Sequence, residues 1–404
     1  MRKPVLTIFY QYNPWRSSIG GIQTLISSFI KYAPDEFEIR LVGVGDRLTQ
    51  KIGVWQETEF QGRILHFFPL FALDNDDVRQ LLPTTVKYTA ALLRSCFASD
   101  FMHFHRIEPT LITRDWQGDK TLFIHNDIRT QFLTNESKQA ILWRYSPQVY
   151  FALERALIGQ FDRVLSCNLA STALYRELYP AMAEKFSSYR NGVDTNIFYP
   201  VSAVESERLR QALAHSLGLG DRTKFLLFAG RLHPQKDPLL LVRSLAALAE
   251  PDVHLLIAGQ GELAADIQAE ATKLGVSERV TMLGAVTQDR LADLHRLASI
   301  CVLTSAYEGL PLVVLEALAC GTPVVTTRAG DTPYLLTEQS GIVCQERTPE
   351  AIAAALRKVL SSSDYFSHQA CLQAVEPYSA KQMIHEIYDT MLRRWQCGAL
   401  SEVG

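Results

Sequence analysis

The sequence predicts an α/β protein built from two doubly wound domains. Short apolar runs alternate with longer amphipathic runs along most of the chain, a pattern typical of parallel strands connected by helices. The alternation stops near residues 200–221 and then restarts. A chain of 404 residues is also too long for one ordinary hydrophobic core, so two domains are expected.

In the first half, each expected strand is a short apolar run that ends at a turn signal. The first run, VLTIFY (5–10), is followed by a loop that ends in Gly20-Gly21 and by the amphipathic helix IQTLISSFIKYA. We expect further strands at 38–45, 63–70, 101–106, 120–126, 163–168 and 187–194, and a further helix at 84–97. This order predicts a parallel sheet with helices on its faces.

The second half has the same architecture without an obvious sequence repeat. The boundary segment, 200–221, begins with Pro and ends in a Gly-rich turn. Strands are expected at 224–231, 253–261, 279–286, 300–306, 323–330 and 341–346. The last segment, 378–396, is expected to be an amphipathic helix because its apolar residues recur at helical spacing. They are Ile384, Ile387, Tyr388, Met391 and Trp395.

The composition limits which kinds of partner and cellular compartment we expect for this protein. Apolar types make up 47% of the residues and charged types 21%, and a net charge of −3 gives no electrostatic reason to expect a nucleic-acid partner. The seven cysteines are scattered without C-x-x-C spacing, which predicts reduced core thiols and a cytoplasmic protein.

We interpret the N-terminal run as a buried strand rather than a signal peptide. No apolar run reaches the roughly 18 residues of a membrane span, so membrane contact is expected only as peripheral binding, at the inner membrane face.

One apolar segment carries two carboxylates. The stretch YEGLPLVVLEALACGTPVV (307–325) contains Glu308 and Glu316, and Pro311 and Gly321 predict a short helix from about Pro311 to Cys320. The helix follows a strand, so its N-terminus opens at the carboxyl edge of the sheet, where open α/β sheets bind ligands. Free N–H groups and the positive end of the helix dipole suit an anion such as a diphosphate.

Glu316 lies inside this helix, which is apolar on nearly every side. A buried, ionised carboxylate is costly unless hydrogen bonds or a partner compensate it. A ribose diol would donate hydrogen bonds to the carboxylate without bringing charge. The alternative is a distant arginine or a backbone donor, and the spacing alone leaves both open.

Two cations are expected at the same edge of the sheet. Arg231 and Lys236 follow the strand KFLLFAG. Arginine binds phosphate through its planar fork, and lysine acts as a point charge. Taken without their neighbours, these residues could equally be solvated surface cations.

The two glutamates, which have seven residues between them and are followed by ALACGTPVV, resemble the E-x7-E segment of retaining glycosyltransferases of family 4, which have the GT-B fold. Other segments resemble that family in the same order along the chain. They are IGGIQTLI, RNGVDTNIFYP, FAGRLHPQKDPLLLVRSLAAL, VHLLIAGQGE and RVTMLGAV. The match extends over nearly the whole chain and is densest from 186 to 345.

The resemblance implies two Rossmann-like domains that face a central cleft. It assigns 1–200 to an acceptor-binding domain and 201–375 to a nucleotide-sugar-binding domain. The segment 376–404 is implied to be a helix that crosses back to the first domain. Closure of the domains over the donor is expected from the same resemblance.

The resemblance also implies roles for individual residues. It makes His125, Arg231, Lys236 and Glu308 the catalytic residues, with His125 contacting the donor sugar. The donor-binding residues are implied to be Gly20, Gly21, Arg231, Lys236, Gly284, Glu308, Gly309, Leu310, Pro311, Leu312 and Glu316. A histidine at the end of a strand can also be purely structural, and this alternative stays open for His125.

We expect no metal and no cofactor. The tract LDNDD (73–77) is similar to the D-x-D of metal-dependent transferases, but Arg231, Lys236 and the helix N-terminus are already expected to neutralise the phosphates. The pair of histidines in HFH (103–105) has no evident third ligand, which favours packing at the edge of the core.

Acceptor-binding residues are expected in the first domain. Arg16, Gln23 and Arg129 are the candidates, together with the stretch 141–161, which mixes aromatic residues with arginines. That stretch would suit a lipid-bound acceptor at a membrane surface, and ordinary helix packing is the alternative.

The sequence thus favours a retaining enzyme that moves a sugar from a UDP- or GDP-linked donor to a hydroxyl acceptor. The expected acceptor is a saccharide or a lipid-linked saccharide, in cell-surface polysaccharide or glycolipid synthesis. Two rival functions remain. One is a sugar-nucleotide epimerase of similar fold, which would need further acid and base carboxylates in the first domain. The other is a non-catalytic nucleotide-sugar-binding protein.

Overall fold

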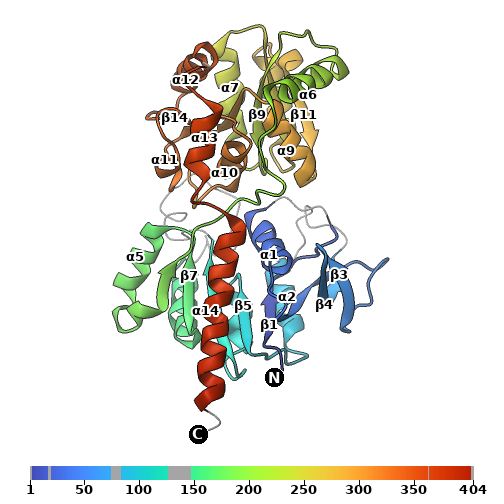
Figure 1. Cartoon of the computed structure of the whole chain (residues 1–404), viewed down its shortest axis with the longest axis vertical. Coiled ribbons are helices and arrows are strands. Elements are labelled where there is room, and N and C mark those ends of the chain that lie inside the picture. Colours follow the sequence, from blue (N-terminus) through green and yellow to red (C-terminus); the bar gives the residue numbers. More distant parts are fainter. Residues whose placement is uncertain (1, 17–19, 74–82, 126–146, 363, 402–404) are drawn as a thin grey trace. The chain divides into compact units, whose positions relative to one another are not determined.

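The computed structural model describes residues 2–16, 20–73, 83–125, 147–362 and 364–401 (Figure 1). Contacts divide the chain into two compact units. Of the described residues, the first unit contains 2–16, Ile22–Arg190 and the C-terminal helix from Lys381 onward. The second contains 20–21 and Asn191–Ala380. Each unit is a largely parallel sheet with helices on both faces, which confirms the predicted fold class.

The sheet of the first unit has eight strands in the order β3-β4-β2-β1-β5-β6-β7-β8. They are β1 (Val5–Phe9), β2 (Glu38–Gly45), β3 (Gln56–Phe60), β4 (Arg63–Ala72), β5 (Phe101–Phe104), β6 (Asp119–Ile124), β7 (Arg163–Ser166) and β8 (Phe186–Ser188). All neighbouring strands are parallel except β3 and β4, which form an antiparallel hairpin at the edge. Strand β3 was not predicted, because QETEF is a mostly polar strand at the edge of the sheet.

Two hydrophobic cores cover the two faces of this sheet. The helical elements of the first unit are α1 (Gly21–Lys31), α2 (Thr84–Leu92), η1 (Glu108–Ile112), α4 (Pro147–Leu157), η3 (Ile158–Gln160), α5 (Leu169–Leu178), η4 (Pro180–Lys185) and α14 (Ala380–Ser401). One core packs α1 and α14 against the sheet, and the other packs α2 and α4 against the opposite face.

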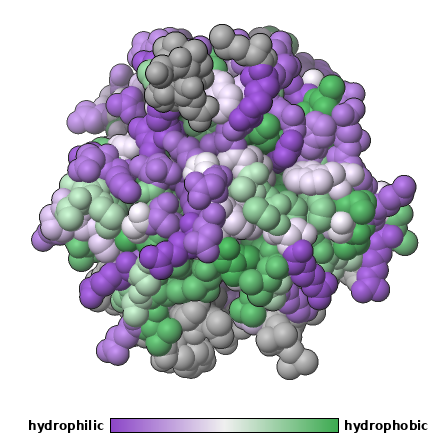
Figure 2. Space-filling model, turned by 90° about the horizontal axis from the view of Figure 1, so that it is seen from below, coloured by the Kyte–Doolittle hydropathy of each residue, from purple (hydrophilic) through white to green (hydrophobic). Residues whose placement is uncertain are grey.

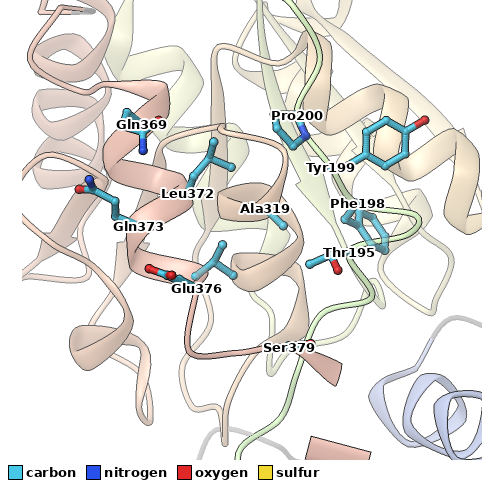
Figure 3. Close-up of a pocket in the computed structure, with 11 residues that line it drawn as sticks. Thr195, Phe198, Tyr199, Pro200, Ala319, Gln369, Leu372, Gln373, Glu376 and Ser379 are labelled. Atoms are coloured by element: carbon cyan, nitrogen blue, oxygen red, sulfur yellow. The ribbon is translucent and has the colours of Figure 1, made fainter. Parts of the chain in front are cut away.

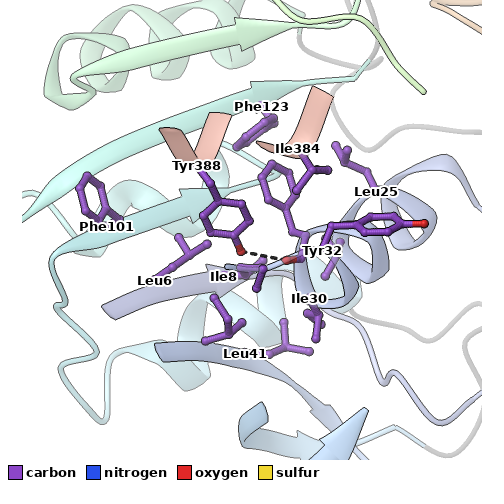
Figure 4. Packing of buried hydrophobic residues seen from close by; sticks show 14 of the residues in the cluster. Leu6, Ile8, Leu25, Ile30, Tyr32, Leu41, Phe101, Phe123, Ile384 and Tyr388 are labelled. Atoms are coloured by element: carbon purple, nitrogen blue, oxygen red, sulfur yellow. Dashed lines mark hydrogen bonds between the residues drawn. The ribbon is translucent and has the colours of Figure 1, made fainter. Parts of the chain in front are cut away.

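The C-terminal helix α14 is an integral part of the first core. Ile384 and Tyr388 on α14 are both 0% exposed (Figure 4). The Tyr388 hydroxyl donates a hydrogen bond of 2.8 Å to the backbone carbonyl of Phe29 on α1. The apolar spacing predicted for this helix therefore corresponds to a buried face.

The sheet of the second unit has six parallel strands in the order β11-β10-β9-β12-β13-β14. They are β9 (Lys224–Ala229), β10 (Val253–Ala258), β11 (Val280–Gly284), β12 (Ile300–Leu303), β13 (Val324–Thr327) and β14 (Gly341–Cys344). Its helical elements are α6 (Ala203–Ser216), α7 (Pro238–Leu248), α8 (Ala264–Lys273), η5 (Ser277–Arg279), α9 (Gln288–Leu297), α10 (Leu312–Ala319), α11 (Thr332–Leu335), α12 (Pro349–Ser361) and α13 (His368–Val375).

The strand order of the second unit reverses between β9 and β12. From β9 the chain builds one side of the sheet through β10 and β11, and then returns to place β12 against the other edge of β9. In doubly wound sheets, ligands bind at the carboxyl ends of the strands where the order reverses. The loops that follow β9 and β12 therefore form the first candidate site.

The surface of the first unit carries exposed apolar side chains. Leu93, Val149 and Leu111 are 69%, 54% and 50% exposed. Seen from below, hydrophobic residues gather in broad patches between hydrophilic ones (Figure 2). Among the residues that the structure describes, no helix has the length and apolar character needed to cross a membrane.

Candidate active site

The loops after β9 and β12 are joined by backbone and side-chain hydrogen bonds. The backbone N–H of Ala306 donates to the carbonyl of Gln235 at 2.8 Å. In return, Gln235 Nε2 donates to the carbonyl of Tyr307 at 3.1 Å. The Thr304 hydroxyl donates to the carbonyl of Lys236 at 2.9 Å. These bonds fix the two loops relative to one another at the carboxyl edge of the sheet.

This arrangement brings two of the predicted catalytic residues into contact. Lys236 Nζ lies 2.5 Å from Glu308 Oε1, although the two residues are 72 positions apart. The Ser305 hydroxyl donates to the same oxygen at 2.5 Å. The Glu308 side chain is 6% exposed and that of Lys236 is 20% exposed. Glu308 therefore holds Lys236 through one oxygen at the edge of the sheet.

Gly330 supports the Glu308 loop from behind. Its φ is +55°, and a Cβ atom at this position would lie 2.2 Å from the carbonyl oxygen of Glu308. The following residue, Asp331, donates its backbone N–H to the carbonyl of Gly309 at 3.0 Å. A residue without a side chain is therefore required at position 330 for the Glu308–Gly309 backbone to take its place.

Asp237 turns the chain directly after Lys236. It adopts a left-handed conformation with φ 42° and ψ 60°. Its Oδ1 accepts the backbone N–H of Leu240 at 3.2 Å and so caps α7, and its Oδ2 lies 2.5 Å from Arg347 NH2. A strained non-glycine residue held by several contacts often marks a functional site. Asp237 was not among the predicted site residues, and its position directly after Lys236 was the one signal for it in the sequence.

The helix expected from Pro311 to Cys320 is present as α10, Leu312–Ala319, with Pro311 immediately before it. The carbonyl of Leu310 accepts a hydrogen bond of 3.2 Å from Asn191 Nδ2, which ties this loop to the start of the second unit. The first residues of α10 and Glu308 thus lie on the same short loop. Free N–H groups at the helix start and the ammonium of Lys236 both favour an anion.

Glu316 is buried on α10 with a residual exposure of 8%. Burial raises the pKa of Glu316 to about 7, and the charge of Lys236 opposes this rise. Among the described residues, no arginine or lysine forms an ion pair with Glu316, and His295 Nε2 lies 4.0 Å from its Oε2. The distant-arginine alternative is therefore not realised in the part of the chain that is described.

The remaining donor-binding candidates of the second unit lie on the same sheet. Arg231 follows β9 and is exposed, and Gly284 ends β11 with φ +68°. Gly20 directly precedes α1 and Gly21 is its first residue, and both group with the second unit. Arg231 and Gly284 thus lie at the carboxyl ends of strands, as expected for ligand-binding loops. That they and the two glycines contact the donor stays a prediction.

His125 follows β6 in the first unit, and its ring contacts other side chains. Its Nε2 lies 2.9 Å from Nδ1 of His105, and its Nδ1 lies 3.3 Å from the hydroxyl of Tyr189. Burial, assisted by the charge of Arg106, lowers the pKa of His125 to about 3, so the ring is neutral. That His125 contacts the donor sugar stays a prediction. To bond the sugar, a ring nitrogen of His125 would have to give up its contact with His105 or with Tyr189.

Histidines 103 and 105 are both buried in the first unit, where each ring packs against Phe123. The described residues contain no group of three or more His, Cys, Asp and Glu side chains arranged to hold a metal ion. Apart from Leu73, the LDNDD tract lies outside the described residues. Packing against Phe123 therefore accounts for the two histidines, and the absence of a metal stays a prediction.

The acceptor candidates are only partly described. Arg16 donates to Asp46 Oδ2 at 2.7 Å and to the carbonyl of Leu73 at 2.6 Å, so its guanidinium joins three loops of the first unit. Gln23 lies half-buried in the first turn of α1. Arg129, and residues 141–146 of the stretch 141–161, lie outside the described residues.

The second unit also contains a hollow of about 420 Å³ near the C-terminal end of α10 (Figure 3). Residues of α13 line one side of it, and the segment that enters the second unit lines the other. The lining residues are Thr195, Phe198, Tyr199, Pro200, Ala319, Gln369, Leu372, Gln373, Val375, Glu376 and Ser379. None of them is a predicted site residue, so this hollow is distinct from the Lys236–Glu308 site.

Comparison of sequences finds a matching family model and relatives that align with part of the chain. Residues 210–372 match the family model described as Glycosyl transferases group 1. The D-inositol 3-phosphate glycosyltransferase of Segniliparus rotundus is 31% identical over 218 residues, which cover 52% of this chain and 47% of that protein. An uncharacterized glycosyltransferase of Methanocaldococcus jannaschii is 35% identical over 169 residues, 41% of this chain and 43% of that protein. The chain spans about half the length of the curated relatives it matches.

Comparison of structures covers both units. Sucrose-phosphate synthase of Thermosynechococcus elongatus superposes with a TM-score of 0.79 at 18% identity, over 98% of this chain and 100% of that one. Anabaena HepE in complex with UDP-glucose superposes with a TM-score of 0.71 at 18% identity, over 96% and 100% of the chains. The chain therefore has the GT-B fold, and residues 210–372 of its second unit match the glycosyl transferases group 1 model.

Proposed function

We propose that this protein is a retaining, metal-independent glycosyltransferase that transfers a sugar from a nucleotide-diphosphate sugar to a hydroxyl acceptor. The observation that carries the proposal is the meeting of Lys236, Glu308 and the start of α10 at the switch point of the second sheet. A cation and free helix N–H groups side by side provide the counter-charge that a diphosphate needs. The match of residues 210–372 to the glycosyl transferases group 1 model supports the same activity.

Each residue has a distinct part in the proposed reaction. Lys236 and Arg231 bind the diphosphate, and Lys236 stabilises the charge that develops as the sugar leaves. Because Lys236 already contacts Glu308, donor binding makes this ammonium bridge the carboxylate and a phosphate oxygen. Glu316 accepts the ribose hydroxyls through its buried carboxylate, which has no arginine or lysine ion-pair partner among the described residues.

The retaining outcome is proposed as a front-side displacement. In this account the departing phosphate takes the proton of the acceptor hydroxyl, and no protein carboxylate forms a bond to the reacting carbon. Catalysis then comes from stabilising the diphosphate and aligning the acceptor. His125 is proposed to contact the donor sugar as a neutral ring, which agrees with its pKa of about 3.

The proposed donor carries UDP or GDP, and the proposed acceptor is a saccharide or a lipid-linked saccharide. Anabaena HepE, a structural neighbour, was solved with UDP-glucose, which supports a UDP-sugar as the first donor to test. The relative from Segniliparus rotundus is a D-inositol 3-phosphate glycosyltransferase, which supports a polyhydroxylated acceptor. Synthesis of a cell-surface polysaccharide or glycolipid is the proposed context.

Peripheral membrane contact is proposed for the first unit. Leu93 directly after α2, Leu111 on the 3-10 helix η1 and Val149 on α4 are exposed, and η1 contacts both helices. Arg94 and Arg155 are exposed on or beside the same helices. Apolar side chains next to cations suit the surface of an anionic bilayer.

Thermal shift with UDP-, GDP- and ADP-sugars tests the proposal first, followed by product analysis with simple sugar acceptors. We expect one nucleotide class to stabilise the protein, slow donor hydrolysis without acceptor, and a product with the anomeric configuration of the donor. Inversion at C2 of the sugar would instead identify an epimerase. Binding without hydrolysis or transfer would identify a nucleotide-sugar-binding protein.

A further inference from the structure

We propose that His295 is a positioning residue that orients the Glu316 carboxylate toward the ribose hydroxyls of the bound nucleotide. The proposal rests on the proposed function and adds a residue to it. His295 lies on α9 and Glu316 on α10, two helices that pack against each other in the second unit. The residue belongs to none of the sequence motifs that point to the donor.

The ring of His295 is enclosed in the protein. It is 0% exposed, and neither of its ring nitrogens has a hydrogen-bond partner among the described residues. Phe198 packs edge-on against it, with ring centroids 6.1 Å apart. Its Nε2 lies 4.0 Å from Glu316 Oε2, which is slightly beyond hydrogen-bond distance. Because buried polar atoms are rarely left without a partner, Glu316 is the group to which this ring is best matched.

A hydrogen bond between the two side chains requires one of them to move closer. The backbone at His295 is fixed by a hydrogen bond, so we expect the Glu316 side chain to move. The Thr322 hydroxyl donates to the carbonyl of His295 at 2.6 Å. At the other end of the contact, Glu316 is a long side chain that can rotate about its own bonds. A movement of about 1 Å would bring Oε2 within hydrogen-bond distance of Nε2. Oε1 would then remain free to accept hydroxyl groups.

The surroundings of Glu316 make His295 a neutral donor. Four titratable groups face or influence this carboxyl: Lys236 after β9, His295 on α9, Cys301 on β12 and Cys320 at the end of α10. Burial lowers the pKa of His295 to about 3 and raises the pKa of both thiols, so these three side chains are uncharged near pH 7. A neutral imidazole carries one N–H, which on Nε2 points at Glu316.

The test compares two variants of His295 with a control histidine. His295→Phe keeps a ring and removes the donor, whereas His295→Gln keeps an N–H donor on a flexible chain. The control is His254→Phe, because His254 is 5% exposed in the same unit and contacts Thr281 Oγ1 at 2.7 Å. The Kd of UDP and of GDP is measured by calorimetry for the four full-length proteins from pH 6 to pH 9.

We expect His295→Phe to weaken nucleotide binding about tenfold at pH 8, the loss of a hydrogen bond to a charged group, and less at pH 6. His295→Gln recovers most of the affinity, and His254→Phe binds like the wild type. Unchanged binding by His295→Phe overturns the assignment. An equal loss in both His295 variants also overturns it, because a packing role alone explains that result. If the wild type binds neither nucleotide, the proposed function itself fails.

Discussion

Replacement of Glu316 by glutamine is expected to separate stability from binding. Glutamine keeps the shape of the side chain but cannot ionise. In the folded protein, burial raises the pKa of Glu316 from 4.5 to about 7. Since each tenfold change in proton affinity is worth 1.36 kcal/mol, the ionised carboxylate costs the free protein roughly 3 kcal/mol of stability above pH 7.

The sign of the pH dependence follows from proton binding. Below pH 4.5 the carboxyl is protonated in both the folded and the unfolded state, and its ionisation costs nothing. Between pH 4.5 and 7 the folded protein retains a proton that the unfolded chain has lost, so the stability falls as the pH rises. Glu316→Gln lacks this decrease. We therefore expect the variant to match the wild type at pH 4.5 and to exceed it by about 3 kcal/mol at pH 8.

Denaturant unfolding at pH 4.5 and pH 8, with UDP binding measured at pH 8, tests this expectation. The matched control is Glu338→Gln, because Glu338 is an exposed glutamate of the same unit. The control should change neither quantity, whereas Glu316→Gln should gain stability and lose at least about tenfold in UDP affinity. A variant that gains no stability at pH 8 would refute the reasoning about burial, and undiminished UDP affinity would refute the ribose contact.

Three further predictions address the loops and the surface. Lys236→Ala should lower turnover about a hundredfold or more. It should also lower the free energy of unfolding by about 1–3 kcal/mol, because Glu308 loses its cation. If the variant has wild-type turnover, Lys236 has no part in the mechanism. Gly330→Ala should destabilise the protein by more than Gly275→Ala, because a Cβ meets the Glu308 carbonyl at 2.2 Å in the first case and open space in the second. Equal melting temperatures of the two variants would contradict this account of the loop. Leu93→Ser combined with Leu111→Ser should reduce co-sedimentation with phosphatidylglycerol vesicles, whereas Val204→Ser, at an 81% exposed valine of the second unit, should not. Equal sedimentation of all three proteins would exclude the proposed membrane face.

The sequence was sufficient to predict the fold class because its elements have strong local patterns. The strands of the second unit are nearly continuous apolar runs, as buried parallel strands require, and all six were expected at their observed positions within a few residues. Strand β3 escaped because a polar edge strand has no such pattern. The hairpin loop after β3 gives a clearer sequence signal than the strand, because a two-residue loop favours glycine. Gly62 has a positive φ there, and so does Gln61.

The contact between Lys236 and Glu308 could be anticipated because both follow parallel strands, whose carboxyl ends lie at one edge of the sheet. The residues that support this contact could not be anticipated from the sequence. Ser305 reaches Glu308 only through the turn of its loop, and Asp237 adopts a left-handed conformation that its residue type does not require. The approach of His295 to Glu316 depends on how α9 packs against α10, a long-range contact that no local pattern encodes.

The ribose contact of Glu316 is best measured as the distance from its carboxylate oxygens to the ribose, in a structure of the protein with UDP or GDP bound. We predict that at least one carboxylate oxygen lies within about 3 Å of a ribose hydroxyl. A ribose bound elsewhere, with Glu316 still buried and unconnected to it, would contradict the account.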